Sequence, residues 1–241
     1  TEIYTLSLHD ALPISARAAL MSTRHSASAV VSVGRSVNSM LLESVMSPDV
    51  KNILLAGVGG QGTLLASEIL SETLMLAGFD VKKSEVHGMS QRGGSVTSHV
   101  RYGMKVYSPL IPDGQVDVLF GFELLETYRY LPTLRPGGAV VVNDLKIMPS
   151  TVAMGTEAYP ENIPGKIRAI CPEAKIVDGL DLALKAGNIR TVNTVLLGAL
   201  LQRMEIAEEL WLAGLRKMVP EKFLKENLAA FQLGQIGRAH V

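Results

Sequence analysis

The sequence has 241 residues, and its 23 basic and 23 acidic residues leave no basic excess of the kind that nucleic-acid-binding proteins use. Every apolar run is shorter than the roughly 20 residues of a membrane-spanning helix, so we expect a soluble, cytoplasmic protein. The single cysteine, Cys171, excludes an internal disulfide and cannot supply the several thiolates of an iron–sulfur cluster or a cysteine-based zinc site. We therefore expect no metal site on this chain.

The two ends of the sequence differ in character from its centre. Residues 1–15 and 236–241 resemble translated sequencing-adapter DNA. Residues 16–45 are rich in Ala, Ser and Val with scattered arginines, which is typical of an organelle-targeting peptide or of upstream DNA translated through an open frame. We favour the second interpretation and expect a disordered leader over 1–45, a single domain over 46–234 and an adapter-derived tail over 235–241.

The first elements of the domain surround a run of glycines. Ile53–Ala56 is apolar on both faces, which predicts a central strand that is covered on both sides. Residues 63–77 have helical spacing, and Gly78 is placed to end that helix in the left-handed conformation. The residues expected to share roughly one side of the helix are Leu65, Ile69, Leu70, Thr73 and Leu76.

Two strands are expected next, over 79–86 and 95–103. The second alternates Val96, Val100 and Tyr102 with Thr97, His99 and Arg101, a period of two that indicates one wet or interfacial face. His99 is expected to be structural. Residues 105–111, "KVYSPLI", are a candidate hairpin partner for this strand through Gly103, which would make the sheet mixed.

The remainder alternates strands and helices and ends in helices. Strands are expected over 116–123, 138–144 and 174–179, with a helix from Leu124 that Pro136 and two glycines stop. The last helices are expected within 191–204, 207–219 and 221–234. In the first of these, the broad apolar stripe consists of Val192, Val195, Leu196, Ala199 and Leu200. The pattern predicts an α/β fold: a three-layer α/β/α, Rossmann-like domain with a mostly parallel, mixed sheet and a helical C-terminal part.

The glycine run, "GVGGQG" at 57–62, fits G-x-G-x-x-G between a strand and a helix. Glycines there let the backbone approach a ligand, and the amide groups at the helix start favour a negative group. A dinucleotide-binding site would also need an acid at the end of the second strand, and neither Asp80 nor Glu85 fits that position well. Three interpretations stay open: a tight turn alone, contact with an anion or cofactor, or a site for NAD or FAD.

A second glycine-rich stretch, "EVHGMSQRGGS" at 85–95, follows the second predicted strand. Loops at the carboxyl ends of such strands are where ligands bind, and Gly88, Gly93 and Gly94 let this loop fold tightly. His87 is the one candidate catalytic residue, although we favour an orienting or interface role for it. The alternative is a polar loop that bonds to itself or to a partner chain.

Together, "GVGGQG" and "EVHGMSQRGGSV" resemble the gamma-type subunits of the 2-oxoacid:ferredoxin oxidoreductases, and within that family the beta subunits of its indolepyruvate-oxidising members. "YSPLI", "RTVNTVLLGALL" and "PEKFLKENLAAFQLG" extend the likeness over residues 47–234. The resemblance implies oxidative decarboxylation of an aryl pyruvate with coenzyme A and ferredoxin. It also implies a large alpha subunit that carries thiamine diphosphate, Mg²⁺ and the iron–sulfur clusters.

The residues of this chain agree with a subsidiary role in such an enzyme. The sequence has no G-D-G followed by Asn that would bind thiamine diphosphate through Mg²⁺. The resemblance implies that this chain closes the active site or forms part of the coenzyme A entry, with Arg92 bound to a phosphate or carboxylate. The candidate cofactor-binding residues are Gly57, Gly59, Gly60, Gln61, Gly62, Ser90, Gln91, Arg92, Gly93 and Gly94.

Three other functions remain as alternatives. The first is a free-standing Rossmann oxidoreductase that binds NAD or FAD through Gly57–Gly62. The second is an adenylating enzyme of the ubiquitin-activating type, which also uses G-x-G-G-x-G but expects further Arg, Lys and Cys positions. The third is a non-catalytic assembly module whose helices only bind a partner.

Overall fold

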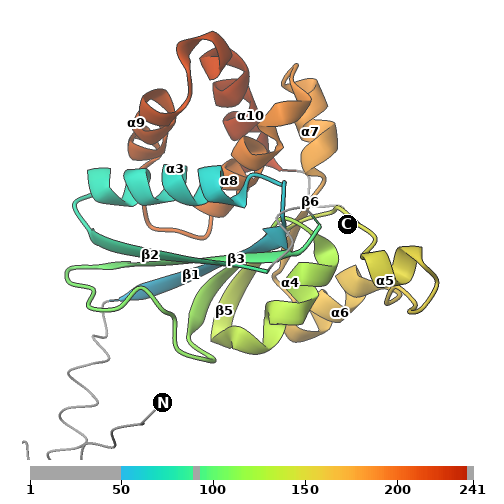
Figure 1. Ribbon diagram of the computed structural model, residues 1–241. Helices are drawn as coiled ribbons and strands as arrows, with labels where there is room; N and C mark the ends of the chain where they lie inside the picture. The colour runs from blue at the N-terminus through green and yellow to red at the C-terminus, as the bar shows by residue number, and fades with distance from the viewer. Residues whose placement is uncertain (1–49, 89–92, 238–241) are drawn as a thin grey trace, which may run out of the picture. The chain divides into compact units, whose positions relative to one another are not determined.

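The computed structural model describes residues 50–88 and 93–237, which form a sheet between two layers of helices (Figure 1). The strands are β1 (Lys51–Val58), β2 (Asp80–His87), β3 (Ser95–Gly103), β4 (Val116–Gly121), β5 (Leu134–Asn143) and β6 (Lys175–Val177). The helices are α3 (Thr63–Leu76), α4 (Leu124–Tyr130), α5 (Ser150–Ala153), α6 (Ile163–Ile170), α7 (Gly179–Lys185), α8 (Val192–Leu201), α9 (Glu208–Met218) and α10 (Leu224–Ile236). Short 3-10 turns are η2 (Leu131–Thr133), η3 (Ile189–Thr191) and η4 (Glu221–Phe223). The expected leader, 1–45, lies outside the described residues, and the domain boundaries stay a prediction.

The strand order is β2-β3-β1-β4-β5-β6, with β1, β4, β5 and β6 parallel to one another. Strand β3 runs antiparallel to both of its neighbours, β1 and β2. The three-layer α/β/α fold with a mixed, mostly parallel sheet is thus confirmed. None of the helices in the described residues has the length and apolar character needed to cross a bilayer.

The hairpin predicted for 105–111 is wrong, because these residues form a loop and not a strand. Strand β3 has no vacant edge, since β1 and β2 occupy both of its sides. Side chains hold the loop instead: Arg101 Nη1 donates to the carbonyls of Ser108 and Leu110, each at 3.0 Å. The Ile111 amide donates to His99 Nδ1 at 3.2 Å, which agrees with a structural role for this histidine.

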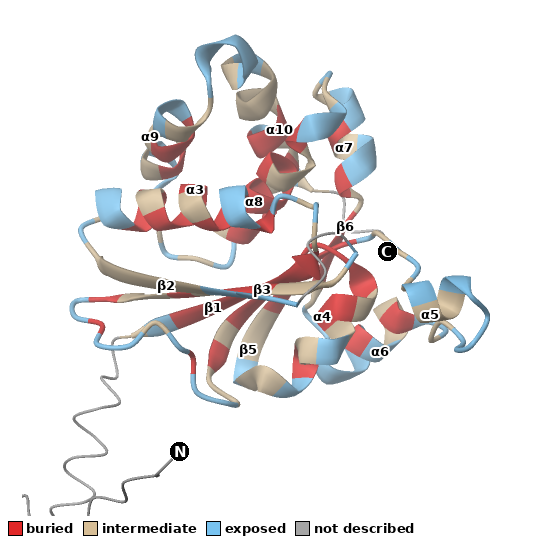
Figure 2. Ribbon diagram, in the orientation of Figure 1, coloured by how far each residue is buried: buried red, intermediate tan, exposed pale blue. Residues whose placement is uncertain are grey.

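Alternate residues of β1 face opposite helical layers, which explains why this strand is apolar on both sides. Ile53 and Leu55 pack in a core with α3, α8, α9 and α10, whereas Leu54 and Ala56 pack in a second core with α4 and α6. The buried residues therefore form two bands, one on each side of the sheet (Figure 2). The predicted central strand is confirmed.

The predicted apolar side of α3 is partly wrong. Leu65 and Leu76 are 48% and 41% exposed. The buried residues are Thr63, Ala66, Ser67, Ile69, Leu70, Ser71, Thr73 and Leu74. This wider face is buried because α3 packs on the sheet and also against α9, where Gly214 lies so close that a β-carbon would come within 2.5 Å of Thr73 Oγ1. The predicted end of the helix is confirmed: Gly78 has a φ of 87°.

Helix α8 is buried from Thr194 to Leu200, so its apolar surface is not the single stripe that the sequence predicted. It lies between the sheet and α10, and two glycines let the two helices approach. A β-carbon on Gly198 would lie 2.1 Å from the Phe231 carbonyl oxygen, and one on Gly234 would lie 1.9 Å from that of Val195. Because α10 covers the side of α8 that faces away from the sheet, no wet face remains.

The helix expected from Leu124 to the region of Pro136 ends early. Helix α4 stops at Tyr130, η2 follows with Pro132 in its first turn, and β5 begins at Leu134. Pro136 lies inside β5, where the register with β4 shifts between Val116 and Val118. A proline is tolerated at such an irregularity because no ladder hydrogen bond is needed from its nitrogen. Helices α5, α6 and α7 were not predicted.

Candidate functional site

The turn between β1 and α3 needs its glycines for two separate reasons. Gly60 and Gly62 have φ values of 100° and 76°, which side chains disfavour. Gly57 is needed for space: a β-carbon there would lie 2.9 Å from Thr63 Cγ2 and 3.0 Å from Phe122 Cβ. The backbone consequently turns from strand to helix within a few residues, and β4 packs close against it.

Gln61 points inward at this turn and links β1 to the end of β4. The Val58 amide donates to Gln61 Oε1 at 2.7 Å, and Gln61 Nε2 donates to the Phe122 carbonyl at 2.9 Å. Helix α3 follows β1 on one face of the sheet and α4 follows β4 on the other (Figure 1), so this is the topological switch point of the sheet. Ligands of open α/β sheets bind in that crevice, and here the amide of Gln61 lies across it.

The start of α3 is held from the side by α8. Asn193 Nδ2 donates to the carbonyls of Gln61, at 2.8 Å, and Gly62, at 3.1 Å. A β-carbon at Gly62 would lie 2.7 Å from that same nitrogen. Among the residues that the structure describes, no side chain caps α3 through a hydrogen bond. Its first-turn amide groups therefore keep their ability to donate to an anion or to a partner chain.

The two glycine-rich stretches meet at the carboxyl edge of the sheet. The Gly59 amide donates to the Gly94 carbonyl at 2.8 Å, and the Gly93 amide donates to the Gly59 carbonyl at 3.3 Å. His87, at the end of β2, is exposed, and its Nδ1 lies 3.4 Å from the Gly88 carbonyl. Ser90, Gln91 and Arg92 lie outside the described residues, between these two ends. The structure thus joins Gly57–Gly62 to Gly93 and Gly94 through backbone hydrogen bonds.

The acidic residues considered for a dinucleotide site lie elsewhere. Strand β3 separates β2 from β1, so an acid on β2 is two strands away from the glycine turn. Glu85 Oε1 contacts Ser67 Oγ at 3.2 Å and Lys83 Nζ at 3.2 Å. Asp80, at the opposite end of β2, pairs with Lys82 at 2.7 Å, and this hydrogen bond lowers the pKa of its carboxyl. Neither carboxylate lies where a ribose beside the glycine turn would need it.

A buried carboxylate that the sequence did not single out lies next to this edge. Glu123 is 1% exposed; its Oε1 accepts from the Tyr159 hydroxyl at 2.9 Å and from the Ile147 amide at 3.1 Å, and its Oε2 accepts from the Glu126 amide at 2.8 Å. Burial and the Glu123 charge raise the pKa of Tyr159, so its hydroxyl stays a donor. The only signal in the sequence was an acid directly before an apolar helix, which is typical of an N-cap. Glu123 therefore fixes the segment after β5 and does not present a group to a ligand.

The donor atoms of the described residues do not suit a metal cluster. Within 50–88 and 93–237, no three His, Cys, Asp or Glu side chains are grouped so that they could hold a metal ion. Cys171 is buried, as expected of a small core residue, and its Sγ donates to the Gly138 carbonyl at 3.7 Å. Iron–sulfur clusters need several thiolates, so no electron-transfer step is assigned to these residues.

Comparisons with known proteins show which family this chain belongs to. Residues 52–235 match the family described as pyruvate ferredoxin/flavodoxin oxidoreductase. The chain is 42% identical over 195 residues to indolepyruvate oxidoreductase subunit IorB of Thermococcus kodakarensis, a match over 76% of this chain and 93% of the relative. It is 40% identical to the subunit of the same name from Pyrococcus horikoshii, with the same coverage.

A solved structure shows the same fold. The gamma subunit of a keto/oxoacid ferredoxin oxidoreductase from Geobacter sulfurreducens has a TM-score of 0.55 and 26% identity, over 76% of this chain and 95% of that one. The family match spans both glycine-rich stretches, and the two IorB relatives each match 76% of the chain. The chain therefore belongs to the pyruvate ferredoxin/flavodoxin oxidoreductase family, in which it is similar to the subunits named IorB.

Proposed function

We propose that this chain is the cofactor-free subunit of an enzyme that oxidatively decarboxylates an aryl pyruvate, such as indolepyruvate, with coenzyme A and ferredoxin. A large partner chain carries the thiamine diphosphate, the Mg²⁺ and the iron–sulfur clusters, which supply the carbanion-stabilising and electron-transfer chemistry. The names of the IorB relatives support the substrate class. The single cysteine of the sequence supports the division of labour, because cluster ligation must then come from another chain.

The observation that carries this proposal is the junction of the two glycine-rich stretches. Gly59 bonds to both Gly93 and Gly94, so the described end of the second stretch lies beside the turn that leads into α3. That helix start has no side-chain cap from the described part of the chain and keeps amide donors for an anion. Arg92 directly precedes Gly93 in the sequence, and in this proposal it supplies a guanidinium for a phosphate or a carboxylate. An anionic co-substrate such as coenzyme A fits such a set of donors.

Apolar side chains around the junction support contact with a partner chain. Leu64 and Leu65, on the first turn of α3, are each 48% exposed, and Val86, near the end of β2, is 53% exposed. Ile189 of η3, near Asn193, is 56% exposed. Exposed apolar residues that border a polar loop are typical of protein interfaces. In this proposal His87 holds that interface or orients the substrate.

The test uses a reconstituted complex of this chain with its cognate large subunit. Arg92→Ala is expected to raise the apparent KM for coenzyme A by roughly 10- to 100-fold, because a charge-assisted contact to phosphate is lost. His87→Ala is expected to weaken subunit association or turnover. Arg216→Ala, an exposed change on α9, is the control and should leave both quantities unchanged. Unchanged coenzyme A affinity and turnover in both variants would remove these residues from the site.

The same complex separates the proposal from its alternatives. If the large subunit alone turned over the 2-oxoacid at the full rate, the chain would be an assembly module. Micromolar binding of NAD or FAD to this chain by itself would favour a free-standing oxidoreductase. We expect neither, because the Gln61 amide lies across the crevice that a dinucleotide would enter and β2 does not adjoin β1.

A further inference from the structure

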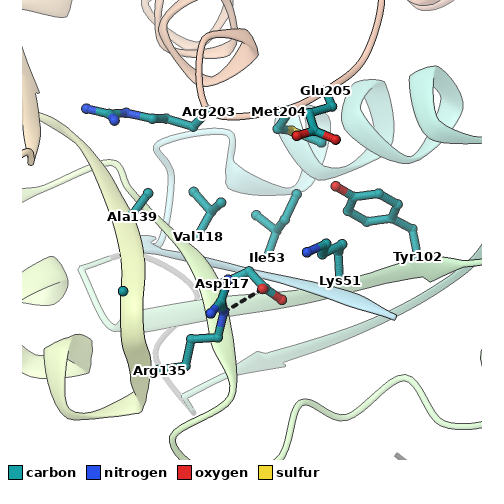
Figure 3. A pocket seen from close by; sticks show the side chains of 11 residues that line it. Lys51, Ile53, Tyr102, Asp117, Val118, Arg135, Ala139, Arg203, Met204 and Glu205 are labelled. Atoms are coloured by element: carbon teal, nitrogen blue, oxygen red, sulfur yellow. Dashed lines mark hydrogen bonds and ion pairs between the residues drawn. The ribbon is translucent and has the colours of Figure 1, made fainter. Parts of the chain in front are cut away.

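A cavity of about 220 Å³ lies at the amino edge of the sheet, the edge opposite to the glycine-rich junction (Figure 3). Ile53 and Val118, near the starts of β1 and β4, and Ala139 of β5, which pairs with Val118, form an apolar floor. The loop after α8 covers it with Met204 and Glu205. Drug-sized ligands occupy pockets of roughly 300–1,000 Å³, so this cavity suits a smaller molecule.

Two opposite charges border this cavity and remain unpaired. Both carboxylate oxygens of Asp117 have partners: Oδ1 accepts from Arg135 Nε at 2.6 Å, and Oδ2 accepts from the Asn52 amide at 2.7 Å. The side chains of Lys51 and Glu205, in contrast, make no hydrogen bond or ion pair with any residue in 50–88 or 93–237. They also lie more than 4.0 Å apart, because no ion pair joins them. One ammonium and one carboxylate therefore face the cavity as separate groups.

Tyr102 adds a neutral donor beside these charges. Burial, followed by the nearby Asp117 and Glu205 charges, raises its pKa to about 12, so the hydroxyl is protonated at neutral pH. Arg203 does not take part, because its guanidinium points away from the other lining side chains (Figure 3) and donates to the Glu173 carbonyl. Apart from the paired Asp117 and Arg135, the groups available to a ligand are thus one cation, one anion and one hydroxyl above an apolar floor.

We propose that this cavity binds a free apolar α-amino acid as its zwitterion. Lys51 and the Tyr102 hydroxyl bind the carboxylate, Glu205 binds the ammonium group, and the side chain lies on Ile53, Val118 and Ala139. A simple carboxylic acid would place its negative charge beside Glu205 and leave that carboxylate unpaired. A simple amine would place its positive charge beside Lys51 and leave that ammonium group unpaired. A ligand that carries both charges satisfies both groups, and an α-amino acid is the smallest such ligand with an apolar side chain for the floor.

The first experiment compares matched ligands on the full chain by calorimetric titration or by NMR chemical-shift changes. L-Phenylalanine is the probe, and 3-phenylpropionate and 2-phenylethylamine each keep the ring but lack one charge. We expect L-phenylalanine to bind with a Kd of roughly 0.1–1 mM, as a small ligand in an open site. Each analogue should bind at least about tenfold more weakly, since one charged contact is lost. Equal binding of either analogue, or no binding of L-phenylalanine, would overturn the proposal.

The second experiment places the ligand. Lys51→Met and Glu205→Gln should each weaken L-phenylalanine binding at least about fivefold, while Lys225→Met, an exposed change on α10, should leave it unchanged. The two test residues are exposed, so these variants are expected to fold, which circular dichroism checks. Loss of binding in the Lys225 control, or full binding in both test variants, would mean that the ligand binds elsewhere. The result is independent of the proposed function, because the cavity lies at the other edge of the sheet.

Discussion

Gln61 bridges two strands at the glycine turn, and replacing it tests whether this residue is structural or ligand-binding. Its side chain accepts from the Val58 amide and donates to the Phe122 carbonyl. Each such hydrogen bond contributes about 0.5–1.5 kcal/mol net, and Val58 is only 8% exposed, so its amide would be left poorly solvated. Gln61→Ala should therefore lower the free energy of unfolding by about 2 kcal/mol. For a domain of this size that corresponds to a Tm lower by about 4–8 °C.

Gln61→Glu is the sharper variant, because it changes one atom of the bridge. The acceptor for Val58 remains, but an oxygen replaces the nitrogen that donates to Phe122. Two acceptors then face each other at neutral pH, which raises the folded-state pKa of the new carboxyl above its unfolded value of about 4.3. Between these two pKa values the folded state binds more protons, so stability should fall as pH rises through this window.

Urea denaturation followed by circular dichroism at pH 4.5 and pH 7 measures both effects. The stability loss in Gln61→Glu, relative to the wild type at the same pH, should be larger at pH 7. A loss below about 0.5 kcal/mol in Gln61→Ala would refute the bridging role, because that is the effect of an ordinary surface change. Full stability combined with weakened coenzyme A binding in the complex would instead make Gln61 a ligand-binding residue.

Three further predictions concern the framework around the site. Gly234→Ala should lower the free energy of unfolding by about 2 kcal/mol. A β-carbon 1.9 Å from the Val195 carbonyl oxygen would cost about 3 kcal/mol in overpacking, and the higher helix propensity of alanine would offset about 1 kcal/mol of it. Thermal unfolding measures the change, and an unchanged Tm would contradict the prediction. Burial lowers the pKa of His99, whose Nδ1 accepts a hydrogen bond from the Ile111 amide. Below about pH 6.5 protonation of this nitrogen should therefore destabilise the wild type and break its bond to the loop over residues 104–112. Faster amide exchange in that loop at low pH would detect this effect. Burial lowers the pKa of Lys175 to about 8, so the stability of the wild type relative to Lys175→Met should rise from pH 8 to pH 10; a flat difference would argue against a buried ammonium.

The local sequence pattern predicted correctly those elements whose formation depends on residues a few positions apart. The apolar run at Ile53–Ala56 identified β1, and helical spacing followed by Gly78 identified α3 and its end, because these signals depend on residues a few positions apart. The α/β class followed from the alternation of such elements. The glycines at 57–62 identified a strand-to-helix turn for the same reason, and the described φ values agree.

Local pattern failed where a residue's partner lies far along the chain. Residues 105–111 have the composition of a strand, but both edges of β3 were already taken. Leu65 and Leu76 have the spacing of a buried face, but the position of α9 decided which side of α3 is covered. The position of Glu123 before a helix indicated at most an N-cap, since its other partners, Tyr159 and Ile147, are more than 20 residues away along the chain.

The sequence by itself determined that two glycine-rich stretches exist and that each follows a strand, because turns and strands depend on short-range backbone preferences. Only the tertiary structure decided that Gly59 pairs with Gly93 and Gly94, and that Gln61 lies across the crevice between β1 and β4. Those contacts depend on the insertion of β3 beside β1 and on the order of the strands, which result from packing across the whole sheet.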